Sequence, residues 1–481
     1  MIVIPILITD NGGRSHEQSI HPVHAMNRAT NRAAARSKRR IPGRPASEEI
    51  LRTAIRQHSA GKLSEAEVVY NKVLDATPRN VDALHFLGVL RHQQGRSEEG
   101  IELIQRALAL APAYVDAWSN LGNLLKETAR LEEAEVAYRR ALALDAHHAA
   151  SWNNLGLVLR ARGLTAEAVE ALHRAVAIRD TFADAHFNLA NALRESCCLP
   201  EAIAAYRKVL LLNAGHARAH YRLGYALYMT GAHDEAAEVF RHWQTVEPEN
   251  PIPAHMVAAC SGDGVPDRAS DDYVRTTFDG FAASFDDVLL HRLDYAAPQL
   301  LREILEPVLG APGHAGDILD AGCGTGLCGP LLKPYARCLT GIDLSPGMLA
   351  KARARKVYDR LQEEEITRFL AANPATFDVI ASADTLCYFG DLRLLTQAAF
   401  RALRAGGWIG FTVERTDDVE SYRLQPHGRY SHARGFVEGV LADAGFEATH
   451  VIPAVLRREL GRNVDGWVFR ARVGKGDDDG A

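Results

Sequence analysis

A 34-residue repeat that runs from Ser47 to Asn250 without an insertion constrains this chain more than any other feature of its sequence. Small residues recur at positions 8 and 20 of its six units, and large apolar residues recur at position 24. Position 8 is occupied by Ala54, Gly88, Gly122, Gly156, Ala190 and Gly224. Because small side chains let two antiparallel helices approach closely, each unit is predicted to form a helical hairpin. Residues 47–250 are therefore predicted to form an all-α solenoid.

Proline marks the end of the second predicted helix in three of the units, at Pro78, Pro112 and Pro248. In period, small-residue positions and helix-ending prolines, residues 47–250 resemble six tetratricopeptide repeats. The resemblance implies a curved solenoid whose concave face is lined by the first helix of each unit.

Asparagine occupies position 6 in three consecutive units, at Asn120, Asn154 and Asn188. A primary amide offers both a donor and an acceptor, so amides in register would hold the backbone of an extended peptide. The peptide-binding repeats of O-linked glycosyltransferases carry a similar asparagine ladder. This interpretation predicts a protein or peptide partner in the repeat groove. The alternative, that asparagine only fills an exposed polar helix face, stays open.

Charge and composition narrow the function classes. Apolar residues make up 47% and charged residues 24% of the 481 residues, which is ordinary globular usage. The net charge of −5 argues against a nucleic-acid partner with a broad basic face. Residues 1–46 are predicted to be a disordered basic tail, with Met26 as an alternative start. No segment is long and apolar enough to span a membrane, so we expect a cytoplasmic protein without a membrane partner.

The seven cysteines form no CxxC pair and have no histidine cluster at zinc spacing, so no metal site is expected. The repeat stops after residue 250, and residues 251–270, rich in proline and glycine, are predicted to be a capping helix and linker. Residues 271–473 then alternate short apolar runs with helices, which predicts an α/β domain with a mostly parallel sheet. Residues 474–481 are predicted to be a disordered tail.

A glycine loop begins the informative part of this second domain. The predicted strand Ile318–Ala321 leads into Gly322, Gly324 and Gly326, and a second strand about 20 residues on ends in Asp343. Glycines let a ligand approach the backbone, and an acid at the next strand end binds both hydroxyls of a ribose. The pattern predicts a nucleoside cofactor at the carboxyl ends of the strands.

The spacing is G-x-G-x-G, with Leu327 where a dinucleotide fingerprint places its third glycine, and no Walker lysine follows. This pattern resembles class I S-adenosylmethionine-dependent methyltransferases, which implies a Rossmann-like domain with a seven-stranded mixed sheet. The matching later segments are Val357–Thr367, Thr376–Ala383, Leu403–Val413, Phe446–Leu456 and Gly466–Val473. The two domains together are similar in layout to predicted bacterial methyltransferases that carry tetratricopeptide repeats.

The resemblance also implies site residues. Asp320 and the loop Gly322–Gly326 would face the methionine part of the cofactor, Asp343 and Leu344 would lie at the ribose, and Asp384 would lie near the transferred methyl group. Glu364 or Glu365 would accept from the adenine amino group, with Glu365 preferred. An exposed charge run at these glutamates is the alternative.

Methyl transfer to a protonated acceptor also needs a proton acceptor. Tyr388, His427 and His432 are the candidates, although histidines in a polar loop also serve as turn residues. The aromatic stretch Tyr273–Phe285 is either a lid over the cofactor or part of the core.

The sequence therefore predicts an S-adenosylmethionine-dependent methyltransferase whose repeats recruit a protein or peptide. The alternatives are a small-molecule methyltransferase that uses its repeats for assembly, and a non-catalytic scaffold. The intact glycines and Asp343 argue against the scaffold.

Overall fold

The computed structural model of this chain describes residues 45–313, 316–459 and 462–474, so the predicted tails lie almost entirely outside the described residues. The chain divides into two compact units between Ala219 and His220. The division falls inside the sixth predicted repeat, and the predicted linker 251–270 lies within the second unit. Among the helices of the described residues, none is both long enough and apolar enough to span a membrane.

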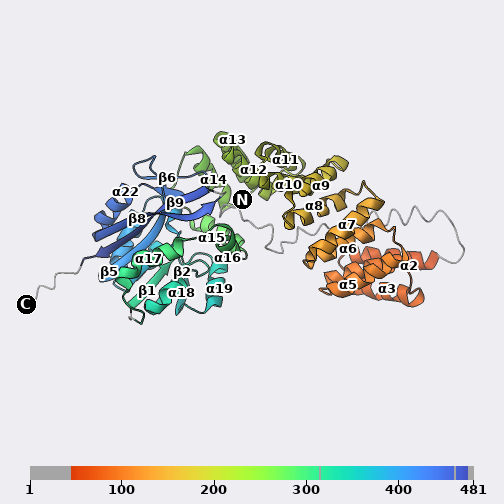
Figure 1. The fold of residues 1–481 in the computed structure, drawn as a ribbon, viewed down its shortest axis with the longest axis horizontal. Helices are drawn as coiled ribbons and strands as arrows, with labels where there is room; N and C mark the ends of the chain where they lie inside the picture. The colour runs from red at the N-terminus through yellow and green to blue at the C-terminus, as the bar shows by residue number, and fades with distance from the viewer. Residues whose placement is uncertain (1–44, 314–315, 460–461, 475–481) are drawn as a thin grey trace, which may run out of the picture. The chain divides into compact units, whose positions relative to one another are not determined.

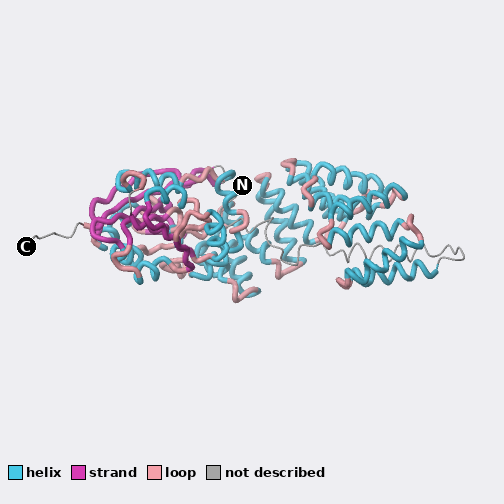
Figure 2. Tube along the Cα trace, turned by 90° about the horizontal axis from the view of Figure 1, so that it is seen from below, coloured by secondary structure: helices cyan, strands magenta, loops and turns pink. Residues whose placement is uncertain are grey.

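The first unit consists of antiparallel helix pairs, one pair for each of the first five repeats, as the sequence predicts (Figures 1 and 2). The pairs are α2 (Pro45–Ser59) with α3 (Leu63–Ala76), α4 (Val81–Gln93) with α5 (Ser97–Leu110), α6 (Val115–Glu127) with α7 (Leu131–Leu144), α8 (Ala149–Ala161) with α9 (Thr165–Ile178), and α10 (Ala183–Glu195) with α11 (Leu199–Leu212).

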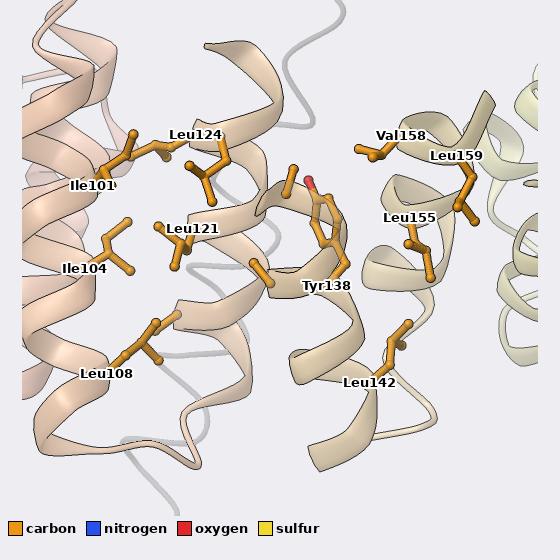
Figure 3. Close-up of a cluster of buried hydrophobic side chains, with 14 of the residues drawn as sticks. Ile101, Ile104, Leu108, Leu121, Leu124, Tyr138, Leu142, Leu155, Val158 and Leu159 are labelled. Atoms are coloured by element: carbon orange, nitrogen blue, oxygen red, sulfur yellow. The ribbon is translucent and has the colours of Figure 1, made fainter. Parts of the chain in front are cut away.

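Close helix approach explains the small residues of the repeat. A Cβ added at Gly122 would lie 2.7 Å from the ring of Tyr138, and one added at Gly156 would lie 2.5 Å from Leu172. Positions 8 and 24 of one unit therefore touch. Around these contacts the repeats share a continuous apolar core, in which Leu121 and Leu155 of successive units are buried (Figure 3). Burial of each such side chain stabilises the fold by about 1.5–3 kcal/mol.

Helix α12 (Ala217–Met229) crosses the division, and the second unit continues with α13 (His233–Val246) and α14 (Pro251–Ser261). Helix α14 packs onto the α/β domain. His255 stacks on Tyr273 with ring centroids 3.9 Å apart, and its Nε2 lies 2.8 Å from the carbonyl oxygen of Gly428. Ala258 and Ala259 share a buried cluster with Leu424 and Tyr430, so this helix belongs to the core of the α/β domain.

A nine-stranded mixed sheet forms the centre of the α/β domain, with β3, β2, β1, β4, β5, β7 and β6 in spatial order. The hairpin of β8 and β9 pairs antiparallel with β5 through β9 (Figure 1). The strands are β1 (Gly316–Ala321), β2 (Ala336–Asp343), β3 (Arg360–Glu363), β4 (Phe377–Ser382), β5 (Leu403–Arg415), β6 (Tyr422–Leu424), β7 (Tyr430–His432), β8 (Phe446–Glu459) and β9 (Arg462–Val473).

Helices complete the domain: α15 (Asp271–Phe281), α16 (Phe285–Arg292), α17 (Ala297–Leu309), α18 (Gly329–Leu332), α19 (Pro346–Arg355), α20 (Ile366–Ala372), α21 (Arg393–Ala402) and α22 (Arg434–Ala444). Leu301 and Leu305 of α17 pack against the sheet.

The Rossmann-like fold is confirmed, with two differences in the strands. The third predicted strand, Val357–Thr367, is reduced to β3, because Glu365 caps the helix α20. Strand β7 lies in the polar loop predicted around His427 and His432, and its partner strand β6 was not predicted, because three residues are too short to display an alternating pattern.

Candidate cofactor and methyl-transfer site

A cavity that is partly open to solvent lies at the carboxyl ends of β1, β2 and β4. Gly322 and Gly324 follow β1, Asp343 ends β2, and Asp384 and Thr385 follow β4; all five residues line the cavity. Strand ends that are far apart in sequence are brought together because neighbouring parallel strands end at the same edge of a sheet.

The glycine loop has no room for side chains at its first position and open space at its second. A Cβ at Gly322 would lie 2.3 Å from Thr385, whereas a Cβ at Gly324 would meet nothing within 4 Å. Gly324 has φ +54°, in the left-handed region that favours glycine. The backbone at this position therefore faces space that a ligand can occupy.

Asp343 fixes the loop. One carboxylate oxygen accepts a hydrogen bond from the N–H of Gly324 at 2.9 Å, and the other accepts from the N–H of Ser345 at 2.8 Å. Burial raises the pKa of Asp343 to about 6, against the lowering effect of these backbone donors. At neutral pH the residue is thus an ionised acceptor inside the cavity.

Asp320 lies behind the loop and is not among the cavity-lining residues. Tyr358 donates its hydroxyl to one carboxylate oxygen at 2.6 Å, and the other oxygen has no hydrogen-bond partner among the described residues. Burial raises its pKa to about 7. Asp320 is therefore not placed in the cavity wall, where its predicted contact with a ligand would require it, and its carboxylate bonds to Tyr358 instead.

Glu365 has a structural role that the sequence did not reveal. It lines the cavity, but its two oxygens accept from the N–H groups of Thr367 and Arg368, at 3.0 and 2.9 Å, and so cap α20. Glu365 therefore caps α20 while it lines the cavity, and its acceptance of a hydrogen bond from adenine stays a prediction. Glu364 also lines the cavity and accepts from the guanidinium of Arg368.

Asp384 lies in the cavity wall with φ +52°, an unusual backbone conformation for a residue with a side chain. Both of its carboxylate oxygens accept from Nη1 of Arg457, at 2.6 and 2.7 Å. Burial raises the pKa of Asp384, and the guanidinium of Arg457 opposes that rise. The carboxylate is therefore held in place by a partner from β8.

Arg457 and Arg429 belong to a buried ionic cluster that also contains Asp384, Glu414 and Glu459. Arg429 donates to Glu414 at 2.5 Å and to Glu459 at 2.9 Å. Burial alone would raise the pKa of Glu414, but the two guanidinium groups hold it well below its usual range. The side chains of Asp384, Cys387 and Glu414 lie close enough to one another to hold a metal ion. The guanidinium of Arg457 bonds to both Asp384 and Glu414, so it fills the space between their carboxylates.

The histidine candidates are not in the cavity wall. His432 is fully buried, and its Nε2 lies 3.1 Å from the carbonyl oxygen of Gly390. Burial lowers the pKa of His432 and of His427 to about 4 in each case. The prediction of His432 as a catalytic base is therefore wrong, because its side chain serves the packing of β7. Tyr388, by contrast, lines the cavity.

The aromatic stretch 273–285 contributes both to the cavity wall and to the core, the two roles that were predicted as alternatives. Phe278 and Phe285 line the cavity, whereas Tyr273 and Phe281 are buried in the core. Sequence reasoning missed Tyr295 and Arg429 as cavity residues. Neither stands in a recognisable local motif, and only the assembled sheet brings them to the glycine loop.

In the repeats, the asparagine ladder bonds mainly to itself. Nδ2 of Asn154 donates to Asn123 of the previous repeat at 2.8 Å, and Nδ2 of Asn188 donates to Asn153 at 2.9 Å. Nδ2 of Asn120 lies 2.8 Å from Nε2 of His85. Asn154 is only 2% exposed, which corrects the prediction that it clamps a peptide from an open face. The amides join successive repeats.

Comparisons with known proteins agree with both halves of the fold. Residues 319–411 match a methyltransferase domain, and residues 51–115, 119–183 and 187–251 match the tetratricopeptide repeat. The chain therefore combines tetratricopeptide repeats with a methyltransferase domain, and it belongs to the methyltransferase domain family.

Three relatives illustrate the match. Methyltransferase-like protein 27 of Homo sapiens is 33% identical over 174 residues, which is 36% of this chain and 69% of that protein. Malonyl-[acyl-carrier protein] O-methyltransferase of Serratia marcescens is 30% identical, over 31% of this chain and 54% of that protein. Ubiquinone biosynthesis O-methyltransferase of Thiobacillus denitrificans is 28% identical, over 29% of this chain and 66% of that protein. The chain thus spans about half to two thirds of these relatives.

Solved structures match the repeats. YrrB, described as a TPR protein with an unusual peptide-binding site, is 21% identical over 39% of this chain and 96% of that one, with a TM-score of 0.34. MamA is 27% identical over 34% of this chain and 96% of that one, with a TM-score of 0.32.

Proposed function

We propose that the α/β domain is an S-adenosylmethionine-dependent methyltransferase and that the repeats recruit a protein or peptide partner. The contact between Asp343 and the glycine loop carries the first part. It sets an ionised acceptor beside a backbone position, Gly324, that opens onto free space. A nucleoside cofactor needs this pair: an acceptor for its ribose hydroxyls, and a loop without side chains for the rest.

The residues of the cavity fit such a cofactor. The loop 322–326 would hold the methionine part, Asp343 would accept from the ribose, and Leu344 and Ile366 would flank the adenine, since all of these segments line the cavity. Each charge-assisted hydrogen bond to Asp343 would contribute about 1.5–3 kcal/mol.

The cofactor, when bound, supplies an activated methyl group, so the chain has to align an acceptor and exclude water. Phe278, Phe285 and Phe389 give the cavity an apolar wall suited to that exclusion. An apolar wall also supports the alternative of a small-molecule acceptor, with the repeats used for assembly.

Label transfer tests the proposal. The full chain is incubated with S-adenosylmethionine carrying a radiolabelled methyl group and with cell extract, which is then separated into protein and small-molecule fractions. We expect label above background in one fraction, and none with Gly324→Val, whose side chain would enter the ligand space. Label in neither fraction, or equal label with the variant, would reject the enzyme. Label in protein supports recruitment, and label in small molecules supports the alternative.

A further inference from the structure

Three hydrogen-bond donors of the cavity wall have no hydrogen-bond partner among the described residues. They are Nη1 of Arg429, which is 1% exposed, and the hydroxyls of Tyr388 and Tyr295. Their positions are related, because Tyr295 and Tyr388 both lie within electrostatic range of Asp384, and Tyr388 lies within range of Arg429. A buried guanidinium nitrogen without a partner, such as Nη1 of Arg429, is costly. Because the buried Tyr388 and the partly exposed Tyr295 line the same cavity, a ligand that accepts hydrogen bonds is expected at this end of it.

The set of donors indicates the charge of that ligand. A guanidinium nitrogen and two hydroxyls can all donate to an anionic oxygen group, whereas the positive charge of the guanidinium would repel an ammonium group. Phe278, Phe285 and Phe389 line the remainder of the cavity with apolar surface. The ligand therefore combines an anionic group with an apolar chain or ring.

Among the described residues, the cavity wall offers no histidine that could act as a base. Neither His427 nor His432 lines the cavity, and both oxygens of Asp384 are bonded to Arg457. An alcohol, a phenol or an ammonium group would have to release a proton to such a base. A carboxylate, with an ordinary pKa near 4, is already deprotonated at neutral pH.

We propose that the methyl acceptor is the carboxylate of an apolar organic acid, bound by Nη1 of Arg429 and by the hydroxyls of Tyr295 and Tyr388. This inference rests on the methyltransferase activity of the proposed function and takes the small-molecule acceptor that was given there as the alternative. One carboxylate oxygen forms a bond to the methyl carbon while the bond from that carbon to sulfur breaks, and the electron pair stays on sulfur. The products are a methyl ester and a neutral thioether, and no proton is released.

Charge balance agrees with this reaction. The ionic cluster contains two guanidinium groups and three carboxylates, so it has no spare positive charge. A bound carboxylate adds one negative charge, which the positive sulfonium of the cofactor offsets. Both charges vanish on transfer, which a low-dielectric cavity favours.

The test compares acids with their own amides on the full chain. Phenylacetate and octanoate, each paired with its primary amide, are titrated calorimetrically with sinefungin present, an unreactive analogue of the cofactor whose ammonium group carries the positive charge of the sulfonium. We expect each acid to bind at least about tenfold more tightly than its amide. Tyr295→Phe and Tyr388→Phe should each weaken acid binding about three- to tenfold and leave amide binding unchanged. Arg429→Gln should abolish the preference.

The Tyr→Phe variants keep the test decisive if Arg429→Gln fails to fold, since they remove only hydroxyls. Label transferred to the acids from S-adenosylmethionine should be released as volatile methanol by mild alkali, as methyl esters are. Equal affinity for acids and amides, no binding of either acid, or alkali-stable label would overturn the proposal. A chain that binds S-adenosylmethionine but shows any of these results refutes this inference alone, whereas a chain that does not bind the cofactor refutes the proposed function.

Discussion

The repeats and the methyltransferase site obtain their side-chain contacts in opposite ways. In the repeats, Gly122 meets Tyr138 and Gly156 meets Leu172, so the contact that closes each hairpin lies within one 34-residue unit. In the site, Arg457 bonds to Asp384, 73 residues earlier, and to Glu414, 43 residues earlier. The local contacts recur in each unit, so the 34-residue period of the sequence predicts them. The ionic cluster, in contrast, forms only when the strands of the sheet have assembled. Substitutions should therefore act locally in the repeats and over several strands in the site.

The largest effect is expected from Arg457→Gln. The variant leaves Asp384, Glu414 and Glu459 without one of their shared cations in a fully buried place, which should cost about 3–5 kcal/mol. Thermal unfolding followed by calorimetry should show the loss in the α/β transition only. Arg458→Gln is the matched control, because Arg458 is the next residue and its side chain is 54% exposed. This substitution should change the free energy of unfolding by less than about 0.5 kcal/mol. Equal losses for the two variants would contradict the account of the cluster.

Two glycine substitutions, one in each region, should change the stability of the protein in opposite directions. Gly156→Ala places a Cβ 2.5 Å from Leu172 and should destabilise the repeats by about 1–3 kcal/mol. Gly439→Ala lies in α22 with open space around the new Cβ and should stabilise the α/β domain by about 0.5–1 kcal/mol. Chemical denaturation with probes for each unit would measure both. A stabilising Gly156→Ala would mean that the hairpins are looser than the close contact indicates.

Asn154→Ala should destabilise the repeats by about 1–2 kcal/mol, because it removes a buried amide that bonds to Asn123. Asn188→Ala, at a partly exposed position with one such bond, should cost less. Denaturant unfolding of the two variants decides between the two interpretations of the ladder. A neutral Asn154→Ala would restore the view that these amides are free for a peptide.

A pH dependence is expected for the site alone. Burial raises the pKa of Asp343 to about 6, above the value near 4 of an unfolded chain. Its contribution to stability is therefore full below pH 4 and is lost as the pH rises through 6. Cofactor binding has the opposite sign, because an ionised Asp343 accepts the ribose hydroxyls. Affinity should fall as the pH drops from 7 to 5, and Asp343→Asn should flatten the profile; an unchanged wild-type affinity over that range would exclude this role.

Much of the molecule could be predicted from sequence because its signals are local. The repeat period fixed the helix pairs, and the G-x-G-x-G loop with Asp343 located the cofactor end of the cavity. The capping of α20 by Glu365 was not predicted, because a helix cap and a ligand acceptor look alike in a row of glutamates. His432 was misjudged because burial is invisible in a loop of polar residues. Arg429 and Tyr295 were missed because their partners are distant in sequence and no motif joins them.

The central claim is that Asp343 and the glycine loop bind S-adenosylmethionine, and calorimetric titration of the full chain tests it most directly. The wild-type chain should bind one equivalent, and Asp343→Ala should weaken binding at least about tenfold by removing charge-assisted hydrogen bonds. Glu363→Ala, at the end of the neighbouring strand β3 and outside the cavity wall, should bind as the wild type does. No heat of binding to the wild type, or equal affinities of all three proteins, would contradict the account.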